Sequence, residues 1–506
     1  MRAVCNHALP DPCPAAFNMA AHVLARAPAL GTKSALMIVT ATEAERWSYA
    51  RLEEAVRGCA TGLLALGLEP GARLLLRLGN TPEFAVAFLG AIAAGLVPVP
   101  TSSQLTAPEI TRLARELSPA LVIAGEAIAL PDHPAPVLRE SALRGFEALE
   151  PAAYAMGGPD RLGYIIYTSG TSGRPRAVMH AHRAIWARRM MHAGWYGLGE
   201  TDRLLHAGAF NWTYTLGTGL MDPWSVGATA LIPGEGVTSD QFGHLLRRYD
   251  ASIFAAVPGV YRQILKHDER LVLPRLRHGL SAGESLSPGL RSAWKDATGT
   301  SLHEALGMSE CSTFVSSCPG HPAPAGTIGY PQPGRHLAVL GPDGTPVARG
   351  EPGILAVHRS DPGLFLGYLD APEETAARYQ GDWFVTGDTV TMAGDGAIAY
   401  VARSDDMMNA GGYRVSPLEV EAALMAHPAA GEVAAVELRV KPEVRVIAVF
   451  YTGSAGAEAL ETHAAACLAR YKQPRIYIHL AALTKNANGK LNRGAMRRAE
   501  EARRGL

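Results

Sequence analysis

A loop rich in glycine and hydroxyl side chains, residues 167–176, constrains this chain more than any other segment. Its sequence is YTSGTSGRPR, and it follows an apolar run, residues 162–167, that is typical of a β-strand. Glycine permits positive φ angles and close backbone approach, so that successive backbone N–H groups can converge on an anion. The hydroxyls add short donors, and Arg174 and Arg176 add positive charge. The loop therefore predicts a polyphosphate site, and an ordinary polar turn is the alternative.

Helix-like and strand-like segments alternate along the first three-quarters of the chain. Helical spacing is found at residues 50–66 and 81–95, and strand-like apolar runs are found at residues 73–78, 120–124, 226–232 and 253–257. Repeated strand–helix units predict a mostly parallel sheet covered by helices, with ligands at the carboxyl ends of its strands. The predicted fold class is therefore α/β.

A change of pattern near Arg403 predicts a second domain. A helix-like segment at residues 417–425 is followed by strands at 433–440 and 445–451 and by a helix near 458–470. A chain of 506 residues also exceeds what one compact core usually organises. We predict a large N-terminal domain with mixed and parallel sheets over residues 1–403, and a small, mobile α+β domain over residues 404–506.

Composition disfavours several classes of function. Lys and Arg together number 47, as do Asp and Glu, so no net charge favours nucleic acid or an anionic membrane. The six cysteines include no CxxC pair, which favours reduced thiols and a cytoplasmic protein. The longest apolar run, residues 84–100, is interrupted by Gly and Pro, so no integral membrane segment is expected. Residues 1–14 have no apolar stretch, so no secretory signal is expected.

Further segments match, in order, the motifs of a known family. They are SAGESL (281–286), LGMSE (306–310), WFVTGD (383–388), Arg403 and TKNANGKL (484–491). Taken alone, each has a simpler explanation, such as a surface carboxylate, a turn or an edge strand. Together with the glycine-rich loop they resemble the AMP-forming adenylating superfamily, which comprises acyl-CoA and aryl-CoA synthetases, luciferases and the adenylation domains of peptide synthetases. The resemblance covers essentially the whole chain.

This resemblance implies an ATP site. The residues implied to hold the phosphates are Thr168, Ser169, Gly170, Thr171, Ser172, Gly173, Arg176 and Ser309. The residues implied to bind adenine and ribose are Ala282, Gly283, Glu284, Leu306, Gly307, Asp388 and Arg403. Glu310 would hold Mg²⁺, a hard cation that prefers carboxylate oxygen, and Thr168 and Lys490 complete the implied catalytic residues. Lys490 would bridge the acyl carboxylate and the α-phosphate as negative charge develops there.

The resemblance also implies a mobile C-terminal domain with a coenzyme A side. That domain would rotate about Asp405 and present Gly411, Gly412 and Tyr413 to the pantetheine arm of coenzyme A. The rotation would move Lys490 away before the thiol enters.

Some positions depart from the family pattern. Arg176 stands for a lysine, Ala177 for a glycine, Leu306 for an aromatic residue and Thr484 for a proline. These departures remove no essential charge. The aliphatic residue at position 306 is also similar to the benzoate and other aryl-CoA ligases.

The segment at residues 209–219 resembles the acyl gate of the family. The predicted acid pocket consists of Trp212, Thr213, Tyr214, Val257, Gly259 and Met308. Pockets for small acids are mostly apolar with a few placed polar groups, and plain core aromatics are the alternative for Trp212 and Tyr214. These candidates include no carboxylate like the one with which amino-acid-activating domains hold an α-ammonium. A simple acid, aryl or short to medium acyl, is therefore expected.

We predict an AMP-forming acid–CoA ligase that uses ATP, Mg²⁺ and coenzyme A. ATP and the acid would give an acyl-adenylate and diphosphate, and coenzyme A would then form the thioester and release AMP. The expected partners are a small carboxylic acid and coenzyme A, with no nucleic acid. Two alternatives stay open: transfer to a carrier-protein phosphopantetheine, and a non-catalytic nucleotide-binding protein.

Overall fold

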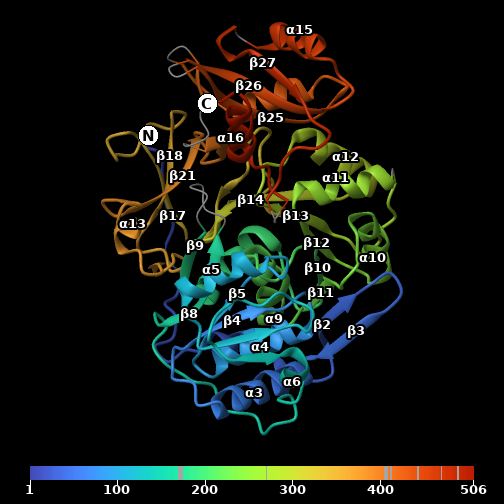
Figure 1. Cartoon of the computed structure of the whole chain (residues 1–506), viewed down its shortest axis with the longest axis vertical. Coiled ribbons are helices and arrows are strands. Elements are labelled where there is room, and N and C mark those ends of the chain that lie inside the picture. The colour runs from blue at the N-terminus through green and yellow to red at the C-terminus, as the bar shows by residue number, and fades with distance from the viewer. Residues whose placement is uncertain are drawn as a thin grey trace. The chain divides into compact units, whose positions relative to one another are not determined.

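The computed structural model describes the chain except residues 9, 169–174, 269, 404–407, 411–412, 442–443, 469, 487–488 and 506, and except the side chains of residues 409, 410, 413, 414, 444 and 471. The chain divides into two compact units (Figure 1). The larger unit comprises Asn6–His336 and Arg359–Tyr379, and the smaller unit comprises Met1–Cys5, Leu337–His358 and Gln380–Leu506. The predicted domain boundary at residues 403/404 falls within the smaller unit and stays a prediction.

A nine-stranded sheet with a parallel centre forms the base of the larger unit. Its strand order is β16-β15-β14-β13-β12-β10-β11-β2-β3, and the six strands from β14 to β2 run parallel. The bounds are β2 Ser34–Val39, β3 Ala44–Ser48, β10 Arg203–His206, β11 Thr229–Pro233, β12 Ile253–Ala256, β13 His278–Ala282, β14 Ser301–Met308, β15 Ser312–Ser316 and β16 Tyr330–Pro331. The mostly parallel sheet expected of an α/β fold is thereby confirmed.

Two helices separate this sheet from a second, four-stranded sheet. These helices are α3 (Tyr49–Ala65) and α4 (Pro82–Ala93). They share one apolar core with Leu36 and Ile232 of the first sheet and with Leu74 and Leu76 of the second sheet. Leu75, between those two leucines, faces the opposite side, as strand alternation requires. All of α4 is buried because it has a sheet on either side, which explains its apolar sequence. The second sheet is parallel, in the order β5 (Val97–Pro100), β4 (Arg73–Arg77), β6 (Leu121–Ala124), β7 (Val137–Arg139).

Outer layers cover both sheets. Helices α10, α11 and α12 pack against the free face of the nine-stranded sheet through Phe254, Tyr261 and Trp294. Helix α5 covers the four-stranded sheet, beside Ile165 of β8. A three-stranded antiparallel sheet completes the unit, with β8 (Leu162–Thr168), β9 (Arg176–Ala181) and β19 (Gly367–Tyr368).

Two helices predicted in the larger unit, at residues 50–66 and 81–95, are confirmed as α3 and α4. The described residues of this unit form these and further helices. They are α1 Met19–Val23, α2 Ala27–Leu30, α3 Tyr49–Ala65, α4 Pro82–Ala93, α5 Ala107–Leu117, α6 Glu140–Arg144, α7 Ala184–Ala187, α8 Arg189–Met191, η1 His192–Tyr196, η2 Thr215–Met221, α9 Asp222–Val226, η3 Ser239–Gln241, α10 Phe242–Arg248, α11 Pro258–His267, α12 Pro288–Thr298 and α13 Pro372–Ala376. The strand expected at 226–232 begins only at Thr229, because α9 continues to Val226 and ends at Gly227 with φ 85°. Within the described part of the chain, no helix has the length and apolarity to span a bilayer.

The smaller unit contains antiparallel strands followed by an α+β segment. Its sheet includes β17 (His336–Leu340), β18 (Pro352–His358), β21 (Trp383–Met392) and β22 (Ile398–Arg403), with β1 (Val4–Asn6) and β20 (Tyr379–Gln380) at its edges. The α+β segment contains β23 Met408–Ala410, β24 Tyr413–Val415, α14 Pro417–Met425, β25 Ala430–Lys441, β26 Val444–Gly453, α15 Ala457–Cys467, η4 Arg470–Lys472, β27 Ile476–His479 and α16 Arg493–Arg503. The helices and strands predicted there are confirmed, except that α15 ends earlier than expected.

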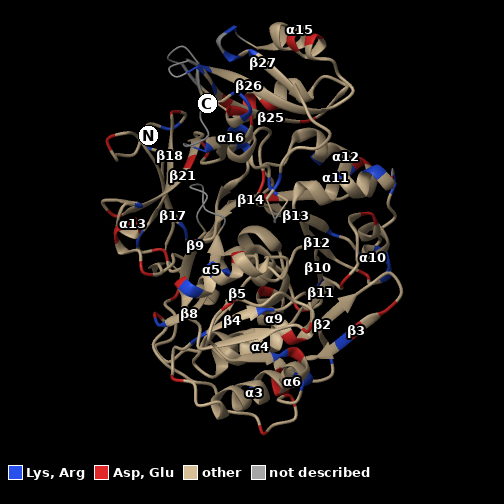
Figure 2. Cartoon of the chain, in the orientation of Figure 1, with Lys and Arg blue, Asp and Glu red and all other residues tan. Residues whose placement is uncertain are grey.

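Positively and negatively charged residues are scattered over the ribbon of both units (Figure 2). This distribution agrees with the equal totals of acidic and basic residues.

Candidate active site

The glycine-rich loop joins two paired strands of the larger unit. Strand β8 ends at Thr168, β9 begins at Arg176, and these two residues are direct neighbours across the antiparallel pair. The predicted phosphate-binding residues between them, Ser169, Gly170, Thr171, Ser172 and Gly173, lie outside the described residues. The two described ends of the loop are therefore held together by the sheet.

A cluster of polar side chains lies at the base of this loop. Arg176 forms an ion pair with Glu374 of α13 (Nε–Oε2 3.0 Å), and its guanidinium lies 5.2 Å from the ring centre of Tyr368. The Tyr368 hydroxyl donates to Glu310 Oε1 at 2.6 Å. Burial, and then the nearby Glu310 carboxylate, raise the pKa of Tyr368, so this phenol keeps its proton. We call Arg176, Tyr368 and Glu310 the loop-base cluster.

Sequence reasoning identified Arg176 and Glu310 but missed Tyr368 and Glu374. Tyr368 lies in an apolar run, LFLGYL at residues 364–369, that carries no polar motif. It reaches the site because β19 pairs with β9, where Tyr368 is opposite Val178. This pairing joins segments that are distant in the sequence, so no local pattern could have indicated it.

A tight hairpin between β14 and β15 positions Ser309 and Glu310. The register shifts between Leu306 and Gly307, and the hairpin closes with Met308 opposite Ser312. A Cβ at Gly307 would lie 2.3 Å from the Ser312 carbonyl oxygen, so the strands approach closely enough here to require glycine. The backbone carbonyl of Glu310 accepts a hydrogen bond from Phe365 N (2.8 Å). The hairpin thus holds Glu310 toward β19.

The surroundings of Glu310 are compatible with Mg²⁺. Among the described residues, no three His, Cys, Asp or Glu side chains form a group that could hold a metal ion. Mg²⁺ does not require such a group, since it usually retains waters and binds one or two carboxylates together with substrate phosphates. Glu310, which shares the neighbour Tyr368 with Arg176, offers such a single carboxylate.

The predicted adenine-side residues lie at the carboxyl ends of neighbouring parallel strands. Ala282 is the last residue of β13 and pairs with Ala305 of β14, directly before Leu306 and Gly307. Gly283 turns the chain out of β13 with φ 92°, and Glu284 is half-buried in the loop that follows. The structure therefore brings these residues together at one edge of the sheet.

A buried carboxylate that sequence reasoning missed anchors this adenine-side loop. Glu304 Oε1 accepts a hydrogen bond from Leu286 N (3.0 Å), and its Oε2 pairs with Arg291 of α12. Burial raises the pKa of Glu304 to about 7, and Arg291 opposes this shift. Glu304 lies two positions before the LGMSE motif, but its sequence position does not reveal that it is buried.

The predicted acid-pocket residues surround the same edge of the sheet. Trp212 packs edge-on against Tyr214 (5.2 Å between ring centres), and Tyr214 donates to the Leu280 carbonyl (3.2 Å). Both belong to one apolar cluster with Ala282 and Ala305, in which Tyr214 is buried and Trp212 is partly exposed. Val257 follows β12 and caps α11, which contains Gly259, and Met308 ends β14. Thr213 is buried.

In the smaller unit, the predicted ribose-binding pair is brought together. Asp388 and Arg403 are opposite each other in β21 and β22, with Arg403 Nη1 3.2 Å from Asp388 Oδ1. Tyr400, which sequence reasoning missed, donates to the same oxygen at 3.3 Å. Burial raises the pKa of Asp388 above its ordinary value, while Arg403 opposes this shift.

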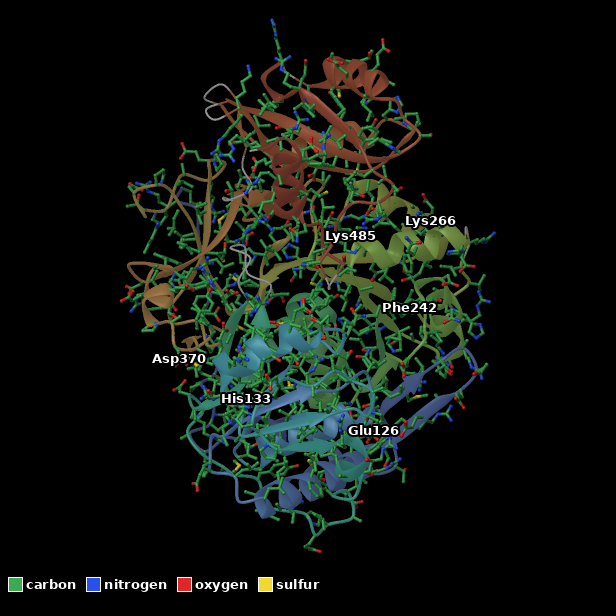
Figure 3. All side chains as sticks on the ribbon, viewed as in Figure 1. Glu126, His133, Phe242, Lys266, Asp370 and Lys485 are labelled. Atoms are coloured by element: carbon green, nitrogen blue, oxygen red, sulfur yellow. The ribbon has the colours of Figure 1, made fainter. Side chains whose placement is uncertain are left out.

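Lys490 lies at the end of a turn in the smaller unit. Asn486 N donates to the Lys490 carbonyl (2.8 Å), Lys490 N donates to Asn486 Oδ1 (2.9 Å), and Gly489 has φ 78°. The nearby Lys485, labelled in Figure 3, forms an ion pair with Glu432 (Nζ–Oε1 2.7 Å). The predicted hinge Asp405 and the predicted coenzyme A residues Gly411 and Gly412 lie outside the described residues, and only the backbone of Tyr413, in β24, is described.

The chain matches known protein-family models and individual proteins. Residues 25–369 match the model of the AMP-binding enzyme family, and residues 419–490 match the model of the AMP-binding enzyme C-terminal domain. The chain is 31% identical over 500 residues to benzoate–CoA ligase of Thauera aromatica, with 90% of this chain and 92% of that protein covered. It is 31% identical over 480 residues to 4-hydroxybenzoate–CoA/benzoate–CoA ligase of Rhodopseudomonas palustris, with 89% and 88% covered.

Solved structures resemble the fold as well. The crystal structure of the anthranilate CoA ligase AuaEII in complex with anthranoyl-AMP has a TM-score of 0.89 and 25% identity, and covers 98% of this chain and 99% of that one. A benzoate CoA ligase from Burkholderia xenovorans LB400 has a TM-score of 0.87 and 28% identity, and covers 95% of this chain and 100% of that one.

Proposed function

Because the chain belongs to the AMP-binding enzyme family, we propose that it is an AMP-forming ligase that joins a carboxylic acid to coenzyme A. The acid is aryl, or a short to medium acyl acid, in keeping with the relatives that act on benzoate. The observation that carries the proposal is the loop-base cluster, in which Arg176 and Glu310 both contact Tyr368 beside a phosphate-type loop.

In the first step, an oxygen of the acid attacks the α-phosphorus of ATP, and the bond to the diphosphate breaks. Arg176, with Thr168, Ser169 and Thr171, holds the leaving diphosphate, for which the fork of Arg provides paired donors. Glu310 would hold Mg²⁺, which would neutralise charge on the phosphate oxygens. Lys490 stabilises the charge that develops between the carboxylate and the α-phosphate.

In the second step, the thiol sulfur of coenzyme A loses its proton and attacks the carbonyl carbon of the acyl-adenylate. The thioester bond forms, and the bond to AMP breaks. The C-terminal domain, over residues 404–506, rotates about Asp405 between the two steps. Gly411, Gly412 and Tyr413 then face the pantetheine arm, and Lys490 withdraws from the carbonyl. Ala282, Gly283, Leu306, Asp388 and Arg403 hold the adenosine in both steps.

Diphosphate release tests this proposal, measured with ATP, Mg²⁺ and coenzyme A over benzoates, cyclic acids and linear acids of increasing length. Release that depends on the acid and consumes coenzyme A is expected. Release that consumes no coenzyme A would instead favour a carrier-protein acceptor. ATP binding without release for every acid would favour a non-catalytic nucleotide-binding protein.

We also propose a cytoplasmic location for this enzyme. All six cysteines are free thiols, which a reducing compartment preserves.

A further inference from the structure

A small cavity in the larger unit adjoins the predicted acid pocket. Its volume is about 10 Å³, close to what one water molecule needs. Its lining includes Thr213, Arg188, Ser312 and His180. Thr213 belongs to the predicted acid pocket, and Ser312 is the cross-strand neighbour of Met308, another member of that pocket. The cavity therefore shares Thr213 with the predicted acid pocket and adjoins the strand pair that carries Met308.

Buried charge beside this cavity is already compensated. Arg188, only 4% exposed, forms a two-pronged ion pair with Asp222, which is fully buried (Nε–Oδ1 2.9 Å, Nη2–Oδ2 2.6 Å). Arg335, which also lines the cavity, pairs with Asp361 at 2.6 Å. Because both guanidinium groups already have a carboxylate partner, an anionic occupant would gain little from them.

Unused hydrogen-bonding capacity nevertheless lines the cavity. Thr213 is 8% exposed, and its Oγ1 has no hydrogen-bond partner among the residues that the structure describes. The same holds, within the described part of the chain, for Nε2 of His180, whose pKa burial lowers to about 3, so this ring is neutral. Arg188 Nη1 has two N–H groups and donates to the Ser312 hydroxyl. A buried polar atom without a partner is costly, so the cavity favours a small polar occupant.

Glycine at position 217 makes this arrangement possible. A Cβ there would lie 2.2 Å from Cζ of Arg188. The buried guanidinium therefore occupies the space that a side chain would otherwise fill, and its Nη1 can reach Ser312 on β15.

We propose that this cavity receives a hydroxyl substituent of the acid, so that the preferred substrate is a monohydroxylated aryl acid rather than the unsubstituted acid. The inference rests on the proposed ligase function. A hydroxyl has one heavy atom and matches the cavity volume of about 10 Å³. It can accept a hydrogen bond from Arg188 Nη1 and donate one to Thr213 Oγ1. A carboxylate or a nitro group is too large for this space, and a methyl group would leave Thr213 without a partner.

Kinetic comparison of matched acids tests the inference. Acid-dependent diphosphate release is measured as kcat/KM for benzoate and for 2-, 3- and 4-hydroxybenzoate. We expect one hydroxylated isomer to exceed benzoate by about tenfold or more, as a site that hydrogen-bonds a substrate hydroxyl discriminates against the analogue that lacks it. In Thr213→Val, which keeps the shape of the side chain, the ratio of kcat/KM for the preferred hydroxybenzoate to kcat/KM for benzoate is expected to fall about tenfold.

Two further variants make the test specific. Ser312→Ala is expected to lower the same ratio, and it serves if Thr213→Val does not fold. Ser317→Ala is the matched control, since Ser317 is also buried with an Oγ that has no partner among the described residues, but it does not line the cavity. Its ratio should equal that of the unmodified chain.

The outcomes separate this inference from the function on which it rests. Activity on benzoate with no preference for any hydroxybenzoate would overturn the inference alone, and would favour a water molecule as the occupant. Equal losses in Ser312→Ala and Ser317→Ala would also overturn it. The absence of diphosphate release with every acid in the full panel would overturn the proposed function and the inference with it.

Discussion

At the scale of single residues, one phenol hydroxyl orders the charged groups at the loop. Tyr368 donates to Glu310 Oε1 at 2.6 Å, and its ring faces the guanidinium of Arg176. A hydrogen bond to a carboxylate fixes the direction in which that carboxylate presents its other lone pairs. Tyr368 is thus a positioning residue for the proposed magnesium ligand.

Tyr368→Phe removes this hydrogen bond while keeping the ring. We expect kcat for diphosphate release to fall about tenfold, because a hydrogen bond to a charged group contributes roughly 1.5–3 kcal/mol. The half-saturating Mg²⁺ concentration should rise as well, which a purely structural role would not cause. The measurement is diphosphate release at varied Mg²⁺.

Tyr167→Phe is the matched control for this variant. Tyr167 is on β8, close to the same loop, and among the described residues its hydroxyl forms only a long hydrogen bond to the Leu113 carbonyl (3.4 Å). An unchanged Mg²⁺ dependence in Tyr368→Phe, or an equal change in both variants, would contradict the assigned role.

At the scale of elements, the adenine-side loop depends on Glu304 of β14, which contacts both the loop and helix α12. Glu304 on β14 accepts from Leu286 N at 3.0 Å and pairs with Arg291 on α12. Since burial raises the pKa of Glu304 to about 7, the protonated form is favoured in the folded chain. The folded chain therefore binds more protons than the unfolded chain between the ordinary carboxyl pKa and about 7.

Stability should therefore depend on pH through this residue. Its contribution is fully present below the unfolded pKa of about 4.3 and is lost as pH rises through about 7. In Glu304→Gln, which does not ionise, the free energy of unfolding relative to the unmodified chain should increase by about 2 kcal/mol between pH 5 and pH 8. Urea denaturation at several pH values measures this difference.

An exposed glutamate provides the reference for that experiment. Glu116→Gln, on α5, changes the same chemistry at the surface and should show no comparable trend. A relative stability of Glu304→Gln that is flat or decreasing with pH would show that Glu304 is ionised in the folded chain throughout this range.

At the scale of the whole molecule, the proposed residues belong to two compact units. The loop-base cluster and the acid pocket are in the larger unit, whereas Asp388, Arg403 and Lys490 are in the smaller unit. Two units that carry complementary parts of one mechanism suit a reaction in which the parts are needed at different steps.

Lys490→Ala should therefore affect the two half-reactions differently. Adenylation, measured as acid-dependent diphosphate release, is expected to fall about 100-fold or more, the loss typical when a donor to a developing charge is removed. Thioester formation from a supplied acyl-adenylate should be largely retained. Lys485→Ala is the control, because this neighbouring amine pairs with Glu432. Equal losses in both half-reactions would contradict the role of Lys490.

Local patterns in the sequence were sufficient for many of the elements. The helix at residues 50–66 and the strands at 73–78 and 253–257 agree with α3, β4 and β12 within two residues. Periodicity and chain-breaking Gly and Pro act over a few residues, so they are legible without a fold. The predicted start of β11, at residue 226, was wrong because α9 extends into the apolar segment before the strand.

The sequence by itself determined the fold class, the family and the ordered motifs from the glycine-rich loop to Lys490, because each motif is a contiguous string. Only the tertiary structure decided that Tyr368 meets Glu310, that Glu304 lies buried under the adenine-side loop, and that Arg188 and Thr213 line one cavity. These pairs join residues far apart in the chain through strand pairing and layer packing. Burial and unpaired hydrogen-bonding groups are properties of that packing, so no string of residues can display them.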